Sequence, residues 1–204
     1  MNTKKETTGF ITIPMINITI NDKKLQVQEG KTVLEAAIEA GIKIPTLCYH
    51  KELTPYGACR LCLGEITAGG KLGLQTACLC EAKEGMVVKT DTEKVIATRK
   101  IIFELLLARS PDSEKIKKLA QEYGVTGTRI SLKNKGPCIL CGLCVRVCAE
   151  ITGRQAISFC HRGTKRKVCT PFNKNSELCI GCGACAYLCP TGAIKIEEAD
   201  KNEG

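Results

Sequence analysis

The chain has 204 residues, of which 44% are hydrophobic and 25% charged, and a formal net charge of +9 at pH 7. This length suits one or two small globular domains, and no apolar run approaches the roughly 18 residues that span a membrane. Aromatic residues do not alternate with the basic ones, so the charge does not predict nucleic-acid binding.

Cysteine is the unusual residue type, with 15 in the chain. The first residues lack the apolar segment of a signal peptide, so we expect a cytoplasmic protein with reduced thiols. An odd number of cysteines also fits a disulfide framework poorly. Reduced thiols in this number point to metal, and anionic metal clusters would offset part of the positive charge.

After a tail over residues 1–14, the first regular pattern predicts a hairpin and a helix. Apolar and polar residues alternate over 15–28 on either side of a turn, which predicts a β-hairpin. Thr32 and Glu35 have the spacing of a capping box, and the helix that they begin is expected to stop at Gly41.

Two further short strands are predicted, over residues 61–67 and 86–89. A hairpin, a helix and more strands together predict a small α+β domain over residues 15–91.

Residues 92–135 are expected to form a helical spacer. The longest helical pattern runs over 92–109 and places Arg99 on the exposed side. Ser110, followed by proline, has the pattern of an N-cap for a second helix that ends at Gly124. The face of the first helix that we expect to be buried consists of Val95, Ile102, Leu105 and Leu106.

An internal repeat follows, in which the spacing C-x2-C-x2-C-x3-C occurs twice. This spacing is typical of bacterial ferredoxins that bind two 4Fe–4S clusters. Three thiolates on a tight loop bind one cluster, while the fourth is carried away on a short helix and reaches the neighbouring cluster. Structural zinc is the alternative, but eight thiolates at this regular spacing do not suit tetrahedral zinc sites. The two predicted 4Fe–4S ligand sets are Cys138, Cys141, Cys144 and Cys189, and Cys179, Cys182, Cys185 and Cys148.

The N-terminal region has a third set of cysteines with the spacing C-x10-C-x2-C-x15-C. Four thiolates, two of them close together on one loop, suit a 2Fe–2S cluster, and zinc is the alternative. Cys80 competes with Cys78 for the fourth place. The predicted 2Fe–2S ligands are Cys48, Cys59, Cys62 and Cys78.

The remaining features predict no substrate chemistry. Cys160 and Cys169 have no partners at ligand spacing and are interpreted as ordinary small buried side chains. The basic run over residues 162–167 is interpreted as a solvated loop, with a docking patch for an acidic partner as the alternative. The sequence contains no glycine-rich phosphate loop, so we expect no nucleotide or flavin site and no catalytic residue.

Several of these motifs together resemble one known family. The segments Ile44-Pro-Thr-Leu-Cys48, Ala58-Cys59-Arg-Leu-Cys62 and Leu74-Gln-Thr-Ala-Cys78, with the twin-cluster region 137–194, are similar to the complex I-type iron–sulfur subunit family. That family includes the large iron–sulfur subunit of bacterial complex I, iron-only hydrogenases and the small diaphorase subunit of NAD-linked nickel–iron hydrogenases. In size and layout the chain resembles the small diaphorase subunit.

The resemblance implies a β-grasp 2Fe–2S ferredoxin-like domain, then the spacer, then a two-cluster bacterial ferredoxin-like domain over residues 136–196 and a polar tail over 197–204. It also favours Cys78 over Cys80 as the fourth 2Fe–2S ligand. The chain departs from the family at residues 108–123, which contain no Cys or His where many members carry a further cluster site. We therefore expect one 2Fe–2S and two 4Fe–4S clusters.

The function implied by the resemblance is an iron–sulfur electron-transfer subunit of a multi-subunit NAD(P)-linked oxidoreductase. Its partners would be a flavin- and NAD(P)-binding iron–sulfur subunit and a catalytic subunit of hydrogenase or formate dehydrogenase type. An electron-bifurcating complex that also exchanges electrons with ferredoxin belongs to the same hypothesis. The alternative is a free-standing multi-cluster ferredoxin that acts as a soluble carrier.

Overall fold

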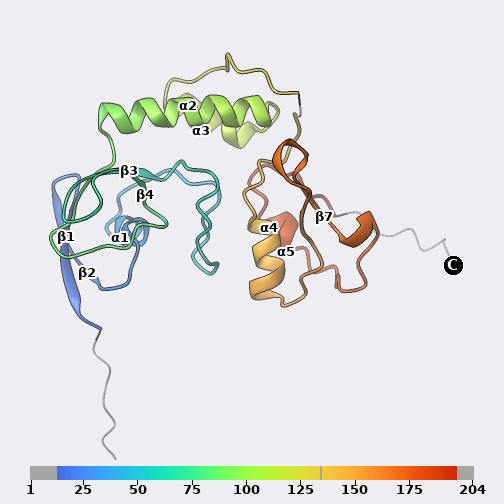
Figure 1. Cartoon of the computed structure of the whole chain (residues 1–204), viewed down its shortest axis with the longest axis horizontal. Helices are drawn as coiled ribbons and strands as arrows, with labels where there is room; N and C mark the ends of the chain where they lie inside the picture. Colours follow the sequence, from blue (N-terminus) through green and yellow to red (C-terminus); the bar gives the residue numbers. More distant parts are fainter. Residues whose placement is uncertain (1–12, 134, 197–204) are drawn as a thin grey trace, which may run out of the picture.

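The computed structural model describes residues 13–133 and 135–196. The tail expected over residues 1–14 therefore lies almost wholly outside the described residues, and the tail over 197–204 lies outside them entirely. Figure 1 shows a sheet region (residues 13–91) and a cysteine-rich region (residues 135–196) side by side, with one long helix running above the sheet region toward the cysteine-rich region. Among the described residues, no helix is long and apolar enough to cross a membrane.

The sheet region is a five-stranded mixed sheet with the strand order β2-β1-β5-β3-β4. Strands β1 and β5 are parallel, whereas the other neighbouring pairs are antiparallel. The hairpin expected over 15–28 is confirmed, but β4 was not predicted, because its four residues include a glycine and no alternating apolar pattern. The strands are β1 (Met15–Ile20), β2 (Lys23–Gln28), β3 (Leu63–Ala68), β4 (Gly73–Thr76) and β5 (Val87–Lys89).

Helix α1 (Val33–Glu39) packs its apolar side against the sheet, as in the β-grasp arrangement expected. The capping box is present, since the Glu35 amide donates to the Thr32 hydroxyl and the Glu35 carboxylate accepts from the Thr32 amide. The helix stops before Gly41, which has a φ of 72°. The chain that leaves this helix carries Cys48 toward β3.

Helix α2 (Glu93–Arg109) begins after its N-cap Thr92. Of the face expected to be buried, Val95 is buried and Ile102 and Leu106 are partly buried against the core, but Leu105 is not, and other residues are buried in addition. The buried side chains include Arg99 and Phe103, at 3% and 0% exposure, whereas Leu105 is 46% exposed. The assignment of Arg99 to the exposed side was wrong. Its guanidinium is buried because it donates to three backbone carbonyl groups, those of Leu61, Leu63 and Thr90.

Helix α3 (Glu114–Glu122) starts later than the sequence predicts, after the N-cap Ser113. Ser110 instead ends α2, and its buried hydroxyl donates to the carbonyl oxygen of Pro137 at 3.1 Å. The expected end at Gly124 is correct, with a φ of 70°. Ser110 thus joins the helical segment to the start of the cysteine-rich region.

The cysteine-rich region has short elements around tight loops. A short helix begins one residue before the third cysteine of each repeat, slightly earlier than expected, and the first helix continues into a π-helical turn that carries Cys148. A two-stranded antiparallel hairpin between the repeats was not predicted. The elements are α4 (Leu143–Arg146), η1 (Val147–Ile151), β6 (Ser158–Cys160), η2 (Gly163–Lys165), β7 (Lys167–Cys169), η3 (Pro171–Asn173) and α5 (Ala184–Tyr187).

Candidate metal centres

The structure brings the four predicted 2Fe–2S cysteines close enough to interact with one another, and all four are buried. They associate in two pairs. The Cys59 amide donates to the Cys48 sulfur at 3.4 Å, and the Cys59 thiol also hydrogen-bonds to Cys48. In the same way, the Cys78 amide and thiol donate to the Cys62 sulfur. Two thiols for each of two iron atoms is the arrangement that a 2Fe–2S rhomb requires.

The pairing changes the acidity of these thiols. The hydrogen bond from the Cys59 thiol lowers the pKa of Cys48 to about 6, and the bond from Cys78 lowers the pKa of Cys62 to about 7. The pKa values of Cys59 and Cys78 are raised, first because each donates to its partner and then because of burial. Each pair therefore readily supplies one thiolate, which is the form that binds metal.

Cys80, the competing fourth ligand, lies apart from these pairs. It is half-buried, and its thiol contacts the carbonyl oxygen of Glu81 at 3.9 Å. Burial raises its pKa, and no other cysteine contributes to that shift. The geometry therefore favours Cys78 over Cys80 as the fourth cysteine of the 2Fe–2S set.

Arg99, which the sequence analysis missed, supports the loop that carries the close pair of cysteines. Its Nε donates to the carbonyl oxygen of Leu61 at 3.0 Å and its Nη2 to that of Leu63 at 2.5 Å. These two residues flank Cys62. Arg99 stands between Thr98 and Lys100, so nothing in the sequence around it indicated that its side chain would be buried.

The first predicted 4Fe–4S ligand set lines a single cavity of about 170 Å³. Backbone amides of Leu140 and Ala193 donate to the sulfurs of Cys138 and Cys189, at 3.4 and 3.1 Å. Amide-to-sulfur hydrogen bonds of this kind stabilise cluster thiolates and tune the clusters they hold. The cysteines that line the cavity are Cys138, Cys141, Cys144 and Cys189.

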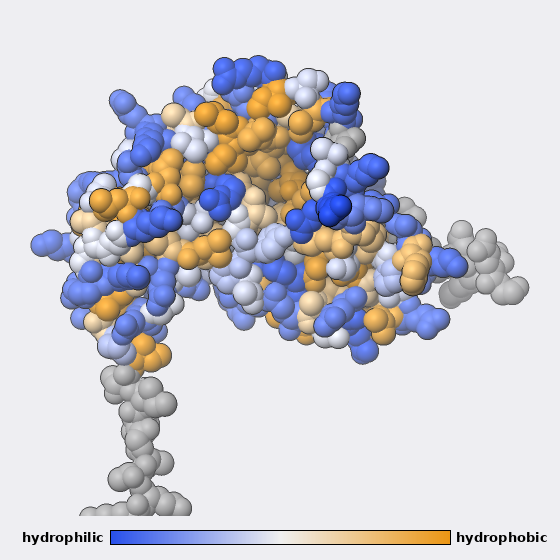
Figure 2. All heavy atoms as spheres, viewed as in Figure 1, coloured by the Kyte–Doolittle hydropathy of each residue, from blue (hydrophilic) through white to orange (hydrophobic). Residues whose placement is uncertain are grey.

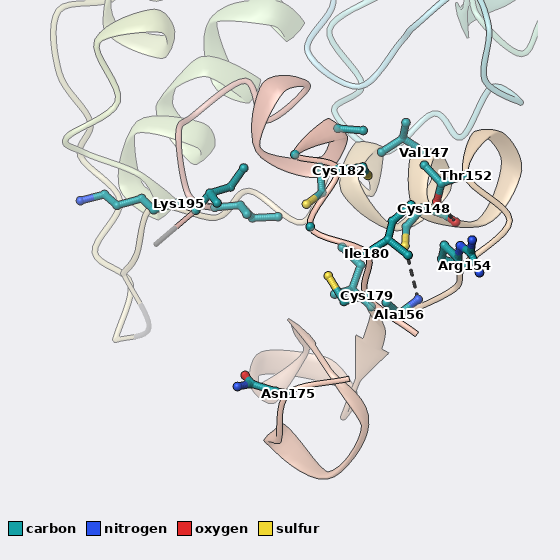
Figure 3. A pocket seen from close by; sticks show the side chains of 17 residues that line it. Val147, Cys148, Thr152, Arg154, Ala156, Asn175, Cys179, Ile180, Cys182 and Lys195 are labelled. Atoms are coloured by element: carbon teal, nitrogen blue, oxygen red, sulfur yellow. Dashed lines mark hydrogen bonds between the residues drawn. The ribbon is translucent and has the colours of Figure 1, made fainter. Parts of the chain in front are cut away.

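The second predicted set lines another cavity, of about 350 Å³, and Figure 3 shows several of its sulfurs with their surroundings. The Ala156 amide donates to the Cys148 sulfur at 3.3 Å. Cys179 and Cys182 are exposed, so this cavity opens toward solvent. The cysteines that line it are Cys148, Cys179, Cys182 and Cys185.

The two repeats have the same backbone conformation in their loops. Gly142 and Gly183 have φ values of 75° and 74°, and Leu140 and Gly181 have 56° and 65°. These residues occupy equivalent positions in the two C-x2-C-x2-C segments. The left-handed residues fold each loop tightly around its cavity, at a cost for Leu140 that glycine avoids.

The 2Fe–2S site and the first 4Fe–4S site share one hydrophobic core, which contains Cys48, Cys59 and Cys141 together with Phe103 of α2. Arg109, at the end of α2, donates from Nε to the carbonyl oxygen of Cys138 at 3.0 Å. The helices of the spacer thus pack against both sites and hold them in one body.

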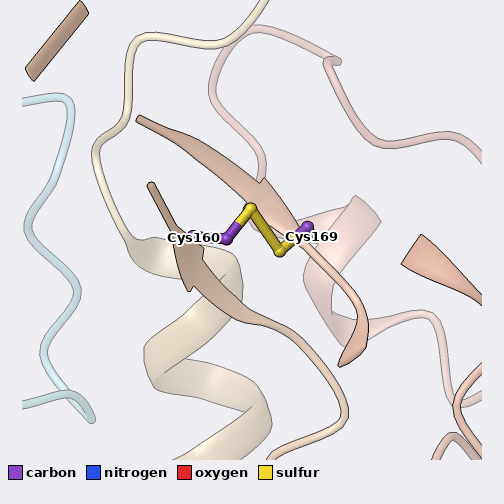
Figure 4. Close-up of a disulfide and its surroundings, with 2 residues drawn as sticks. All are labelled: Cys160 and Cys169. Carbon is purple, nitrogen blue, oxygen red and sulfur yellow. A yellow bond between two sulfur atoms is a disulfide. The ribbon is translucent and has the colours of Figure 1, made fainter. Parts of the chain in front are cut away.

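Cys160 and Cys169 were predicted to be ordinary buried thiols, and that prediction was wrong. They are half-buried and form a disulfide across the β6–β7 hairpin, with their Cα atoms 6.2 Å apart (Figure 4). No sequence pattern indicated this pairing, because it depends on how two three-residue strands align in the hairpin. In the neighbouring basic run, Arg166 is not freely solvated: its guanidinium lies 3.9 Å from the ring centre of Phe159 and donates to the Tyr56 hydroxyl.

Comparison with known proteins gives consistent matches. A 2Fe-2S iron-sulfur cluster binding domain matches residues 14–93, and a 4Fe-4S binding domain matches residues 172–195. A subunit of an NADH-quinone oxidoreductase from Rhizobium meliloti (strain 1021) is 35% identical over 206 residues, covering 88% of this chain and 24% of the relative. NADP-reducing hydrogenase subunit HndD of Solidesulfovibrio fructosivorans is 31% identical over 216 residues, covering 90% of this chain and 36% of the relative.

Among solved structures, a chain of an NAD+-reducing NiFe-hydrogenase in the H2-reduced state has a TM-score of 0.78 and 28% identity, covering 93% of this chain and 90% of that chain. The chain is thus similar, along most of its length, to subunits of NAD(P)-linked oxidoreductases and hydrogenases. It spans about a quarter to a third of the length of the curated relatives above. Its architecture is a 2Fe–2S domain with a mixed sheet, followed by a 4Fe–4S ferredoxin-like region.

Proposed function

We propose that this chain is an iron–sulfur electron-transfer subunit of a multi-subunit NAD(P)-linked oxidoreductase of hydrogenase or formate dehydrogenase type. The observation that carries the proposal is that each of the two cysteine sets expected to bind a 4Fe–4S cluster lines a cavity of its own. The four cysteines expected to bind the 2Fe–2S cluster are buried and hydrogen-bonded in pairs. The relatives and the solved neighbour, named as subunits or parts of NAD(P)-linked oxidoreductases and hydrogenases, support it.

The donor chemistry of the three sets fits iron–sulfur clusters. We assign one 2Fe–2S cluster to Cys48, Cys59, Cys62 and Cys78, and two 4Fe–4S clusters to the cavity-lining sets described above. Such clusters accept and release one electron at a time. The protein's part is to supply thiolates, amide hydrogen bonds to sulfur and an apolar surrounding, which together set the potentials.

The proposal divides the chain by task. Residues 15–91 would hold the 2Fe–2S site, 92–135 would act as the helical spacer and 136–196 would hold the two 4Fe–4S sites. The first 4Fe–4S site shares its core with the 2Fe–2S site, while the second opens toward solvent. Electrons would thus pass through the buried sites to an exposed one that faces a partner.

An apolar outer surface favours a subunit over a free carrier. Ile101 and Leu105 of α2 are 50% and 46% exposed, and Figure 2 shows apolar atoms gathered around this helix in the upper part of the view. Exposed apolar patches on soluble proteins commonly mark protein interfaces. We propose that partner subunits, a flavin- and NAD(P)-binding iron–sulfur subunit and a catalytic subunit, cover such surfaces in the cytoplasm.

The test is anaerobic purification of the chain from its own cells, with every co-purifying polypeptide identified. We expect a flavoprotein with a nucleotide site and a hydrogenase- or formate dehydrogenase-type subunit in stoichiometric amounts. Substituting Ile101 and Leu105 with Glu should release the chain from that complex while its cluster spectra stay unchanged. A wild-type chain that emerges alone, with its iron intact, would establish the free-standing ferredoxin instead.

A further inference from the structure

One side chain, that of Arg146, connects the loop of the 2Fe–2S site with the segment that carries ligands of both 4Fe–4S sites. Arg146 lies in the chain two residues after Cys144 and two before Cys148. Its Nη2 donates to the carbonyl oxygen of Cys48 at 2.6 Å, although the two residues are 98 positions apart. Each of the three predicted sites therefore has one ligand close to Arg146. Two of these ligands are two residues away in the chain, and the third accepts a hydrogen bond from the guanidinium through its carbonyl oxygen.

The same helical segment clamps the 2Fe–2S loop at a second point. Arg146 Nη1 donates to the carbonyl oxygen of Thr54 at 2.5 Å, and the Thr54 amide donates to the Glu150 carboxylate at 2.7 Å. Glu150 lies four residues after Arg146, about one helical turn away. The two side chains therefore bind both backbone polar groups of Thr54, its carbonyl oxygen and its amide. This two-sided contact fixes the position of the loop relative to the first 4Fe–4S site.

Aromatic packing adds a third contact. The Arg146 guanidinium lies 5.7 Å from the ring centre of Tyr56, which stacks on Phe159 of β6 with ring centres 6.2 Å apart. The guanidinium of Arg166 lies over the ring of Phe159. The result is a layered stack of cation, two rings and cation that spans the 2Fe–2S loop, α4 and the β6–β7 hairpin.

Arg146 also brings the positive charge of its guanidinium to this position. Its Nε is buried and has no hydrogen-bond partner among the described residues, so one N–H remains for an anionic group beside it. A positive charge next to a cluster stabilises the reduced form, which is one unit more negative, and so raises the reduction potential.

Building on the proposed function, we propose that Arg146 is the positioning residue for electron transfer between the 2Fe–2S site and the 4Fe–4S sites. It holds the 2Fe–2S loop in register with α4, and its charge raises the potential of the 2Fe–2S cluster. The contacts with Cys48 and Thr54 carry the first part, and the fixed charge at the Cys48 carbonyl carries the second.

The test compares the wild-type chain, loaded with its iron–sulfur clusters, with the variants Arg146→Gln and Arg146→Lys and a control, Lys51→Gln. Lys51 is on the same loop as Cys48, but its side chain is 80% exposed, so water screens its charge. Two quantities are measured: the midpoint potential of the 2Fe–2S cluster by EPR-monitored titration, and the magnetic interaction between the reduced 2Fe–2S and 4Fe–4S clusters. The iron content of each variant is determined alongside.

We expect Arg146→Gln to lower the potential and weaken the magnetic interaction, with Lys51→Gln matching the wild type. Arg146→Lys keeps the charge but loses the paired hydrogen bonds to the Cys48 and Thr54 carbonyl groups. The potential of its 2Fe–2S cluster should therefore lie nearer the wild-type value, while the magnetic interaction between the clusters weakens. If Arg146→Gln does not load, Arg146→Lys decides the positioning role. Loaded Arg146 variants with wild-type potential and interaction would overturn the inference, whereas a wild-type chain without cluster signals would instead contradict the proposed function.

Discussion

The guanidinium of Arg99 donates from Nε to the carbonyl oxygen of Leu61 at 3.0 Å, tying helix α2 to the loop between Cys59 and Cys62. The side chain is only 3% exposed, and it lies 5.7 Å from the ring centre of Tyr123. An arginine in the spacer thus supports the loop of the proposed 2Fe–2S site, which lies 38 residues earlier in the chain. The spacer is part of the site's framework.

Replacing Arg99 with Met should therefore weaken both the fold and the 2Fe–2S site. The change leaves buried carbonyl groups of Leu61, Leu63 and Thr90 without this donor, at a cost on the order of 3 kcal/mol in the free energy of unfolding. Urea unfolding and the 2Fe–2S EPR signal of the loaded protein measure the effect. In the control Arg129→Met, whose partner Glu104 forms a surface ion pair with an 80% exposed arginine, we expect a loss below about 1 kcal/mol. Equal losses in the two variants would contradict this role for Arg99.

The fourth ligand of the 2Fe–2S site is tested by a pair of single substitutions. Cys78→Ser should abolish the 2Fe–2S signal, because Cys78 is the hydrogen-bonded partner of Cys62. Cys80→Ser should leave the signal intact, because its thiol faces the Glu81 carbonyl instead. EPR spectra of the reduced proteins decide, and a signal that survives in Cys78→Ser but not in Cys80→Ser would reverse the assignment.

Gly142 is predicted to be irreplaceable in the first 4Fe–4S loop. A Cβ at this position would lie 3.2 Å from Phe159 Cζ and 3.4 Å from Tyr56 Cδ1, at a φ of 75° that disfavours other residues. Gly163 has a φ of 57° but open space around it, so Gly163→Ala tests the backbone cost alone. We expect Gly142→Ala to destabilise the protein by about 1–3 kcal/mol more than Gly163→Ala, because it also disturbs the aromatic pair. Thermal unfolding of the two loaded proteins measures the difference, which would be absent if the stack has no role.

The Cys160–Cys169 pair predicts a particular pattern of thiol labelling. Without a reductant, alkylation of the unfolded protein should label Cys80 and leave both Cys160 and Cys169 unlabelled, since these two sulfurs are bonded to each other. After reduction all three should be labelled. Peptide mapping by mass spectrometry reads the result. Labelling of Cys160 and Cys169 without reductant would show that the pair exists as free thiols.

Some features of this fold and its sites were accessible from the sequence because they are set by local chemistry. The Thr32–Glu35 capping box and the left-handed stop at Gly41 are confirmed. The two cysteine sets expected from the spacing, with Cys148 and Cys189 exchanged between the repeats, each line one cavity, and their role as cluster ligands is our proposal. Spacing is informative here because cluster ligands must reach a cluster of fixed size.

Other features depend on residues far apart in the sequence and were missed. The buried face of α2 includes Arg99, because backbone carbonyl groups 36 and 38 residues away need a donor, and the aliphatic Leu105 is left outside. Arg146 likewise donates to a carbonyl group 98 positions earlier in the chain. Hydrophobic periodicity ranks arginine as exposed and leucine as buried, so it places Arg99 and Leu105 wrongly where tertiary hydrogen bonds decide which side chain is buried.

The most direct test of the account is the iron content of the anaerobically purified chain, compared with that of the Cys141→Ser and Cys182→Ser variants. One 2Fe–2S and two 4Fe–4S clusters predict about ten iron atoms per chain. Each variant should lose about four of them and keep the 2Fe–2S signal, because the two cavities are separate. A wild-type chain that binds zinc, or holds only about two iron atoms, would contradict the proposed three-cluster relay.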